Sequence, residues 1–293
     1  FAAPGANGCG GPVIKLIVDP SVDLKAGLPA AAGKNTAIMN GSLRQTEARI
    51  VKTEAEIPEF GRCVKVEGVA EGKTIVYHGK YSSSNCVTEA VESLKPGKFE
   101  WSTGPGPSPK FTGSTEVTTM ETVGKAKVTC ASGSSSGEYT GAKTENVSLT
   151  FTGCESASSA CQTSSATPGV ISTAPLTGEL GYIKDNEPLK PLVGLDLKPA
   201  SASYVTKFTC GGVEQTVAGS VIGLVPSIDK MTTAFTLKLK AADGLQVPEE
   251  FEEGAKDTLT TTFGAGPTGE QSGLTSKSAS AAEEAIEIKA RAF

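Results

Sequence analysis

Histidine is nearly absent from this chain: its 293 residues contain only one, His78. Most hydrolytic and acid–base enzymes rely on histidine, because its unperturbed pKa lies near neutrality. No nucleophile elbow of the form G-x-S-x-G lies near His78, so we expect a surface histidine in a hairpin. We therefore predict that the protein has no catalytic residues and is not an enzyme.

Aromatic residues, basic charge and long apolar runs are also scarce. Aromatic side chains make up 5% of the chain, which argues against a cleft where sugar rings stack on them. The net charge of −5 argues against a nucleic-acid partner, because nucleic acid requires a basic surface. No apolar run approaches the roughly 20 residues of a membrane-spanning helix, so we expect no transmembrane segment.

Seven cysteines punctuate a chain that is otherwise rich in Gly, Ser and Thr. None of them forms a C-x-x-C pair, and histidine ligands are missing, so we expect no metal site and no cofactor. Disulfides in an oxidising compartment explain these cysteines better, and we predict a secreted, extracellular protein.

The order of the cysteines does not fix their connectivity, but their spacing favours one scheme. The favoured pairs are Cys63 with Cys86, Cys154 with Cys161, and Cys130 with Cys210. This scheme leaves Cys9 over. Cys9 then forms an intermolecular disulfide, stays a free thiol, or belongs to a different pairing scheme.

Hydrophobic residues alternate with polar ones along most of the chain after Cys63. Short alternating runs separated by Gly, Ser, Pro and Asp are typical of a sandwich or a barrel. We predict an all-β protein built as an antiparallel β-sandwich. Residues 127–130 and 207–210 share a K-x-T-C pattern in similar surroundings, which favours two pseudo-repeated halves.

The N-terminal part has a different composition. Residues 1–40 form a Gly-, Ala- and Pro-rich arm that contains one compact apolar run over residues 13–18. Ser42 and Gln45 form a capping box and predict one short helix over residues 43–54. A proline-rich stretch over 104–109 then separates a small helix and hairpin region, 41–103, from a main domain, 110–293.

The C-terminal segment alternates most regularly of all. Its apolar face consists of Ile286, Ile288, Ala290 and Ala292. A strand with this pattern pairs either with its own sheet or with the edge of a neighbour's sheet.

Two groups of carboxylates are candidate sites. Glu249, Glu250, Glu252 and Glu253 surround Phe251 but lack the Gly and Asp spacing of a calcium loop, so we expect a solvated acidic turn. Asp196 lies between two leucines and is a candidate for a lysine partner or an isopeptide cross-link. A surface aspartate is the default expectation for it.

Several segments of the chain resemble a group of secreted, cysteine-containing, β-rich proteins of soil actinobacteria that has no assigned activity. The resemblance covers roughly residues 58–290 and is carried by residues 60–66, 97–101, 127–130, 134–141 and 193–197. It implies secretion and a β-rich fold, and it implies no catalytic residue.

Three functions remain open from the sequence. The first is a structural subunit of a filament, sheath or surface layer. Such a subunit has other copies of itself as partners, and attachment to the cell surface is compatible with this role. In this hypothesis Val13, Ile14, Leu16, Ile17 and Val18 insert into the sheet of the next subunit, and Cys9 locks the joint. The alternative is a secreted adhesin or a module that binds a ligand or carbohydrate. The third is a hydrolase with two carboxylates and no histidine.

Overall fold

Every regular element that the structure describes is a β-strand, so the all-β prediction is confirmed. The structure is a computed structural model that describes residues 58–91, 96–164, 166–185, 190–266 and 269–290. The chain divides into two units, Phe1–Lys52 and Thr53–Phe293, and all described residues belong to the second. The predicted arm over 1–40 and the predicted helix over 43–54 lie outside the described residues.

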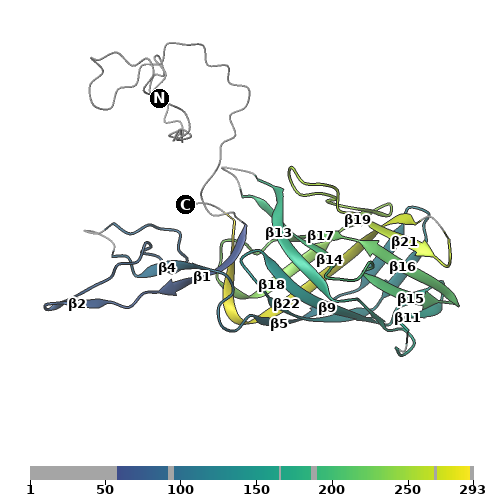
Figure 1. Ribbon diagram of the computed structural model, residues 1–293, viewed down its shortest axis with the longest axis horizontal. Helices are drawn as coiled ribbons and strands as arrows, with labels where there is room; N and C mark the ends of the chain where they lie inside the picture. The colour runs from purple at the N-terminus through teal and green to yellow at the C-terminus, as the bar shows by residue number, and fades with distance from the viewer. Residues whose placement is uncertain (1–57, 92–95, 165, 186–189, 267–268, 291–293) are drawn as a thin grey trace, which may run out of the picture. The chain divides into compact units, whose positions relative to one another are not determined.

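Eight antiparallel strands close into a barrel, so the predicted β-sandwich is wrong (Figure 1). The circuit runs β5–β8–β9–β13–β14–β17–β18–β22 and returns to β5. The strands are β5 (Lys110–Thr115), β8 (Ser132–Tyr139), β9 (Thr144–Thr152), β13 (Leu176–Lys184), β14 (Leu192–Pro199), β17 (Val221–Val225), β18 (Thr232–Leu239) and β22 (Glu270–Lys289).

Sequence alternation could not separate the two architectures. A sandwich and a barrel both bury one face of each strand, and both therefore produce a period of two. The difference lies in the pairing of β22, which joins β18 through Thr236↔Ala279 and β5 through Ala279↔Ser114. Because β22 pairs on both sides, the sheet closes instead of splitting into two layers.

Shorter strands outside this barrel continue it at one end, and their pairings also close on β22. This second circuit runs β6–β7–β10–β11–β15–β16–β21–β22 and returns to β6. Its strands are β6 (Thr118–Thr122), β7 (Lys127–Cys130), β10 (Glu155–Ser156), β11 (Ser159–Gln162), β15 (Thr206–Cys210), β16 (Val213–Gly219) and β21 (Leu259–Phe263). The predicted sandwich of two halves is therefore wrong, because the strands form closed circuits, and β7 and β15, which carry the K-x-T-C pattern, both belong to the second one.

A small lobe of strands precedes the barrel in sequence. It contains β1 (Glu59–Lys65), β2 (Val69–Glu71), β3 (Thr74–Val76) and β4 (Phe99–Thr103). Strand β1 pairs with β4 and also with the C-terminal end of β22, through Phe60↔Ile288. The Lys289 ammonium lies 4.5 Å from the Trp101 ring centroid and 5.0 Å from that of Tyr81. The predicted boundary between 41–103 and 110–293 stays a prediction.

Three short strands complete the structure. They are β12 (Ile171–Ser172), which pairs with β9, and the two-stranded pair β19 (Ala241–Ala242) and β20 (Leu245–Gln246). Phe251, which follows β20, packs over Gly181 and Gly194 on two neighbouring barrel strands. A Cβ atom at Gly181 would lie 2.6 Å from the Phe251 ring, so these glycines make room for it.

The C-terminal strand pairs within its own chain. Ile286, Ile288 and Ala290 are buried, as the alternation predicts, and β22 pairs with β18 and β1 around them. Ala292 lies outside the described residues. Glu287 and Lys289 on the opposite face are also buried, because the lobe and the loop around Asp229 cover that face.

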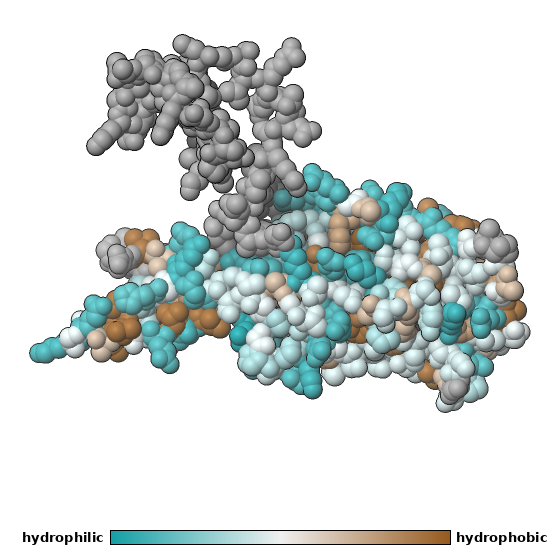
Figure 2. All heavy atoms as spheres, viewed as in Figure 1, coloured by the Kyte–Doolittle hydropathy of each residue, from teal (hydrophilic) through white to brown (hydrophobic). Residues whose placement is uncertain are grey.

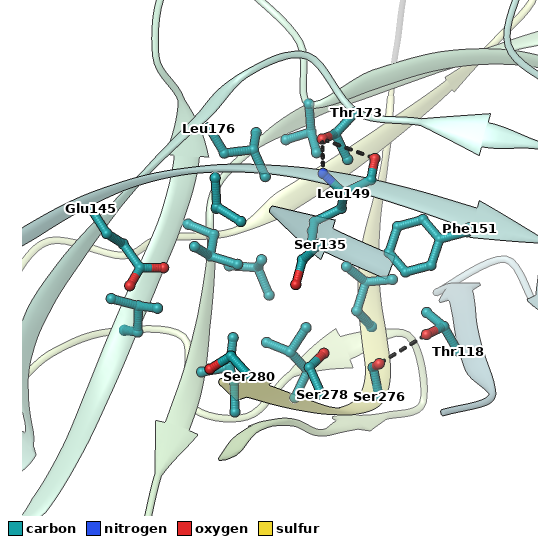
Figure 3. A pocket seen from close by; sticks show the side chains of 18 of the residues that line it. Thr118, Ser135, Glu145, Leu149, Phe151, Thr173, Leu176, Ser276, Ser278 and Ser280 are labelled. Carbon is teal, nitrogen blue, oxygen red and sulfur yellow. Dashed lines mark hydrogen bonds between the residues drawn. The ribbon is translucent and has the colours of Figure 1, made fainter. Parts of the chain in front are cut away.

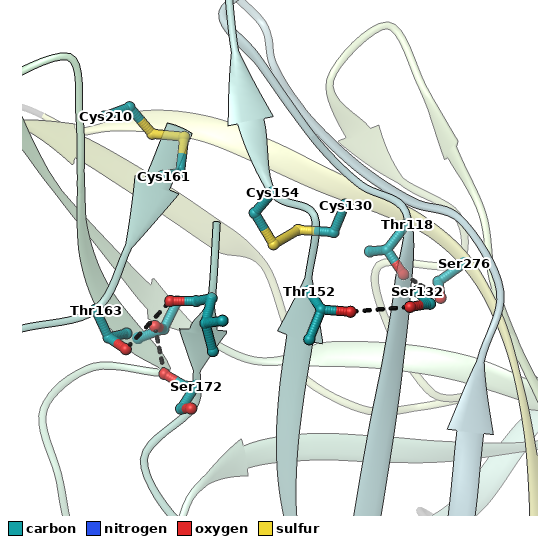
Figure 4. The surroundings of a disulfide bond; sticks show 12 residues. Thr118, Cys130, Ser132, Thr152, Cys154, Cys161, Thr163, Ser172, Cys210 and Ser276 are labelled. Carbon is teal, nitrogen blue, oxygen red and sulfur yellow. Dashed lines mark hydrogen bonds between the residues drawn. A yellow bond between two sulfur atoms is a disulfide. The ribbon is translucent and has the colours of Figure 1, made fainter. Parts of the chain in front are cut away.

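Three disulfides form, and one of the three predicted pairs is confirmed. Cys63 bonds to Cys86 as predicted, whereas the other two pairs are wrong. The structure joins Cys130 to Cys154 and Cys161 to Cys210 (Figure 4). Cys154 directly precedes β10 and Cys161 lies on β11, and each bonds outward to the strand beside this hairpin, which spacing alone does not indicate.

Digestion without reductant tests this connectivity. Cleavage by a glutamate-specific protease after the exposed Glu155 places Cys154 and Cys161 in different peptides. We expect mass spectrometry to find the Cys154 peptide linked to that of Cys130, and the Cys161 peptide linked to that of Cys210. A peptide pair that joins Cys154 to Cys161 would contradict the structure.

Candidate ligand-binding cavity

The barrel encloses a mostly apolar cavity of about 140 Å³. Small eight-stranded barrels either fill their interior with side chains or hold one small ligand there. Protein interiors are normally packed as densely as organic crystals, so an unfilled volume of this size needs an explanation. The explanation lies in which side chains the strands direct inward.

One wall of the cavity is built from small residues on three adjacent strands. Ser280 on β22 lies opposite Gly113 on β5, and Gly113 lies opposite Ser135 on β8. The same strands also direct Ser276, Ser278, Gly133 and Gly137 to this side. Side chains of this size leave the space near the barrel axis empty.

The facing wall carries large aliphatic and aromatic side chains. They are Leu176, Leu180, Leu195, Leu197, Val221, Val225, Phe235 and Leu237, from β13, β14, β17 and β18. Burying each such side chain contributes roughly 1.5–3 kcal/mol to stability. The barrel therefore obtains its hydrophobic stabilisation from one wall and its free volume from the other.

Aromatic side chains pack together at the cavity's edge. The Tyr139 ring centroid lies 4.8 Å from that of Phe60 and 4.8 Å from that of Phe111. Phe60 belongs to β1, and its backbone N–H donates to the carbonyl of Ala142 in the turn between β8 and β9. The small lobe thus contributes one residue, Phe60, to the lining.

Glu145 directs a carboxyl group into the cavity (Figure 3). It lies on β9, two residues before Val147 on the same inward face. Gly178 lies opposite on β13, and a Cβ atom there would be 2.6 Å from the Glu145 Cγ, so the glycine leaves room for the longer side chain. No described residue donates a hydrogen bond to the Glu145 carboxyl or forms an ion pair with it.

Burial raises the pKa of the Glu145 carboxyl to about 8, because the charged form loses its hydration in the apolar interior. Burial also raises the pKa of Tyr139 on the neighbouring strand, and the Glu145 charge adds to that shift. At neutral pH Glu145 is therefore a neutral carboxylic acid, which both donates and accepts hydrogen bonds.

Hydroxyl groups supply the other polar atoms of the cavity. Thr118 and Ser276 hydrogen-bond to each other at 2.8 Å, and the Leu149 N–H donates to the Thr173 hydroxyl at 3.1 Å. Ser135 and Ser280 form no side-chain hydrogen bond with any described residue. A ligand thus meets a few polar groups in an otherwise apolar space, which is typical of small-molecule sites.

Asp196 and Glu287 are buried outside the cavity and have raised pKa values. Asp196 is 3% exposed, so the expected surface position is wrong, and its Oδ2 lies 3.9 Å from the Lys198 ammonium. Burial and then the neighbouring Asp257 raise the pKa of Asp196 to about 7. Burial likewise raises the pKa of Glu287 to about 7, with Asp229 adding to the shift.

The other predicted site residues lie away from the cavity. His78 is exposed, and its Nε2 lies 3.8 Å from Glu71 on the lobe. Glu249 accepts hydrogen bonds from Lys256 and Gln271. Among the described residues no cluster of His, Cys, Asp or Glu is arranged to hold a metal. Cys9 and the predicted exchange strand over 13–18 lie outside the described residues.

Sequence reasoning missed Glu145 although its signal is present. Residues 145, 147, 149 and 151 alternate, and three of them are Val, Leu and Phe, so an acid at the first position shares an apolar face. The apolar alternation begins at Val147, whereas β9 begins at Thr144, so Glu145 precedes the apolar run on its own strand. The small wall also had a signal, the run Gly-Ser-Ser-Ser-Gly over residues 133–137, in which every side chain is small.

Comparisons with known proteins do not identify the chain. No protein-family model, curated protein or solved structure matches it. No helix in the described part of the chain has the length and apolar character to cross a membrane. The cavity therefore has to be interpreted from its own residues.

Glu145 makes stability depend on pH. The unfolded chain loses this proton near the ordinary glutamate pKa, whereas the folded protein keeps it up to about pH 8. The contribution of Glu145 to the free energy of unfolding therefore falls as pH rises. We expect the free energy of unfolding, measured with urea, to decrease between about pH 5 and pH 8. This decrease should be about 3 kcal/mol larger in the native protein than in Glu145→Gln.

Glu138→Gln is the matched control, because Glu138 is exposed on the adjacent strand. Asp196 and Glu287 remain in all three proteins, so the difference isolates Glu145. Equal pH profiles for the native protein and Glu145→Gln would show that Glu145 does not hold a proton in the folded state.

Proposed function

We propose that this protein is a secreted ligand-binding protein that holds one small, mostly apolar molecule inside its barrel. The observation that carries the proposal is the unfilled cavity of about 140 Å³ between a wall of small residues and a wall of large aliphatic ones. Apolar cavities of about 150 Å³ stay dry and bind molecules the size of benzene.

Three disulfides support the secreted part of the proposal. Disulfides form and persist in oxidising compartments, and Cys63–Cys86, Cys130–Cys154 and Cys161–Cys210 are all intramolecular. The eight barrel strands close without a disulfide among them, and two of the bonds hold the second circuit at one end of the barrel, so the interior keeps its shape without a bound partner. Such preorganisation favours binding, because little ordering is left to occur when the ligand enters.

The hydrolase hypothesis receives less support from this cavity. Glycosidases place two carboxyl groups on either side of the bond that they cleave. Glu145 is the one carboxyl group among the described residues that line the cavity. Absence of catalysis nevertheless stays a prediction.

Titration with toluene tests the binding function. We expect saturable binding, measured by shifts of the methyl NMR signals of Leu195 and Leu197 on the aliphatic wall. Ser280→Leu should abolish binding, because the larger side chain occupies the cavity from the small wall. Binding by Ser280→Leu as tight as that of the native protein would contradict the proposal.

Ala281→Leu is the matched control. Ala281 is the next residue on β22 and points to the exposed outer face, so the variant adds a similar volume outside the barrel. It should bind toluene as the native protein does. A circular dichroism spectrum with unchanged strand content shows that each variant is folded.

A structural subunit that associates with itself is our second proposal. The observation that favours it is apolar exposure on the small lobe, where Val69 is 53% and Ile75 61% exposed on the hairpin of β2 and β3 (Figure 2). Exposed apolar surface is commonly an interaction site. Strand exchange with residues 13–18 and a lock through Cys9 stay predictions.

Electron microscopy of negatively stained native protein tests the second proposal, with and without reductant. Ordered filaments, sheaths or layers would support a structural role, and their loss in Cys9→Ser would identify the lock. A variant that lacks residues 1–24 should not assemble if those residues donate a strand. Discrete single particles under all conditions would contradict self-assembly and leave the ligand-binding proposal untouched.

A further inference from the structure

We propose that the molecule held in the barrel is a small amine whose protonated nitrogen pairs with the Glu145 carboxylate. Its apolar body, about the size of one six-membered ring, lies against the aliphatic wall. This inference rests on the proposed function, because it names the class of ligand for the same cavity.

The first argument is the state of Glu145 itself. Its carboxyl group lines the cavity and has no partner among the described residues. A buried polar group without a partner is costly, and an acidic group costs more than a hydroxyl. A leucine or methionine at this position would stabilise the fold by burying apolar surface. The carboxyl group therefore lowers stability unless a ligand forms hydrogen bonds with it.

The second argument is the sign of the available charge. No Lys, Arg or His is found among the described residues that line the cavity. A carboxylate or phosphate ligand would therefore lack a positive partner and would face Glu145. A cationic nitrogen is the ligand group that gains most, because a charge-assisted hydrogen bond is stronger than a neutral one.

The third argument is that nothing nearby competes for the carboxyl group. Tyr139 faces it from β8, Gly178 faces it from β13 without a side chain, and Leu195 on β14 contacts the same space. Tyr139 is the one titratable group among these three, and it stays neutral below its raised pKa. The nitrogen therefore meets one acid and no other charge.

The hydroxyls on the small wall lie farther along the barrel, because Ser135 is opposite Leu149, four residues along β9 from Glu145. Ser135 and Ser280 lie on either side of Gly113 and form no side-chain hydrogen bond with any described residue. An ammonium group donates up to three hydrogen bonds. One donated to Glu145 leaves two for water, and the Ser135 and Ser280 hydroxyls stay available to the far end of the ligand.

Binding releases one proton. In the empty cavity at neutral pH Glu145 is protonated, and the amine arrives from solvent as an ammonium ion. The ammonium–carboxylate pair forms when the carboxyl proton passes to solvent. Affinity should therefore rise with pH up to the pKa of Glu145, about 8, and fall above the amine's own pKa, where the ammonium is lost.

Three ligands with the same ring isolate the role of the nitrogen. Calorimetric titration at pH 8 compares benzylamine, benzyl alcohol and toluene against the native protein, Glu145→Gln and Glu138→Gln. We expect benzylamine to bind the native protein best and to lose at least about tenfold in affinity in Glu145→Gln. Toluene should bind all three proteins equally, and Glu138→Gln should behave as the native protein.

The outcomes separate this inference from the proposed function. Toluene binding without a preference for benzylamine, or benzylamine binding that is unchanged in Glu145→Gln, overturns the amine and leaves the cavity function standing. Tighter binding of benzyl alcohol than of benzylamine overturns it as well, because Glu145 would then serve a neutral ligand. If none of the three ligands binds, the proposed function itself fails.

Discussion

Pairing of β22 on both sides is the constraint on which the rest of the structure depends. This strand has 20 residues and joins β18 to β5 in one circuit and β21 to β6 in the other. Closure leaves no open edge among the eight barrel strands, and an open edge is where unrelated chains pair. It also forces one face of every strand into a shared interior, so the inward residues alone decide what the barrel contains.

The interior combines two opposing demands. Hydrophobic stabilisation requires large buried side chains, whereas a binding cavity requires that some volume stay empty. The barrel meets both by dividing them between walls, with leucines and valines on β13, β14 and β17 and serines and glycines on β5, β8 and β22. Glu145 lies on β9, between β8 of the small wall and β13 of the aliphatic wall, and it is the one acidic side chain among the described lining residues.

The sequence predicted the strands better than their arrangement. The alternation after Cys63 recurs in strands such as β18, and the C-terminal alternation matches the end of β22, because side-chain periodicity is local. Barrel closure and the pairing of Cys130 with Cys154 depend on contacts between distant strands, which local periodicity does not contain. The cavity was missed for a related reason: Ser135 and Ser280 look ordinary until Gly113 brings them into one layer.

The position of β22 has a consequence for how the chain folds. This strand follows every other barrel strand in the sequence, yet both circuits need it. Neither circuit can close before residues 270–289 have been synthesised and can pair. Until then, the earlier strands have unpaired edges and exposed apolar faces. Folding dominated by such distant pairings is slow. The stable form of the molecule therefore arises in a late closing step, when β22 pairs on both sides.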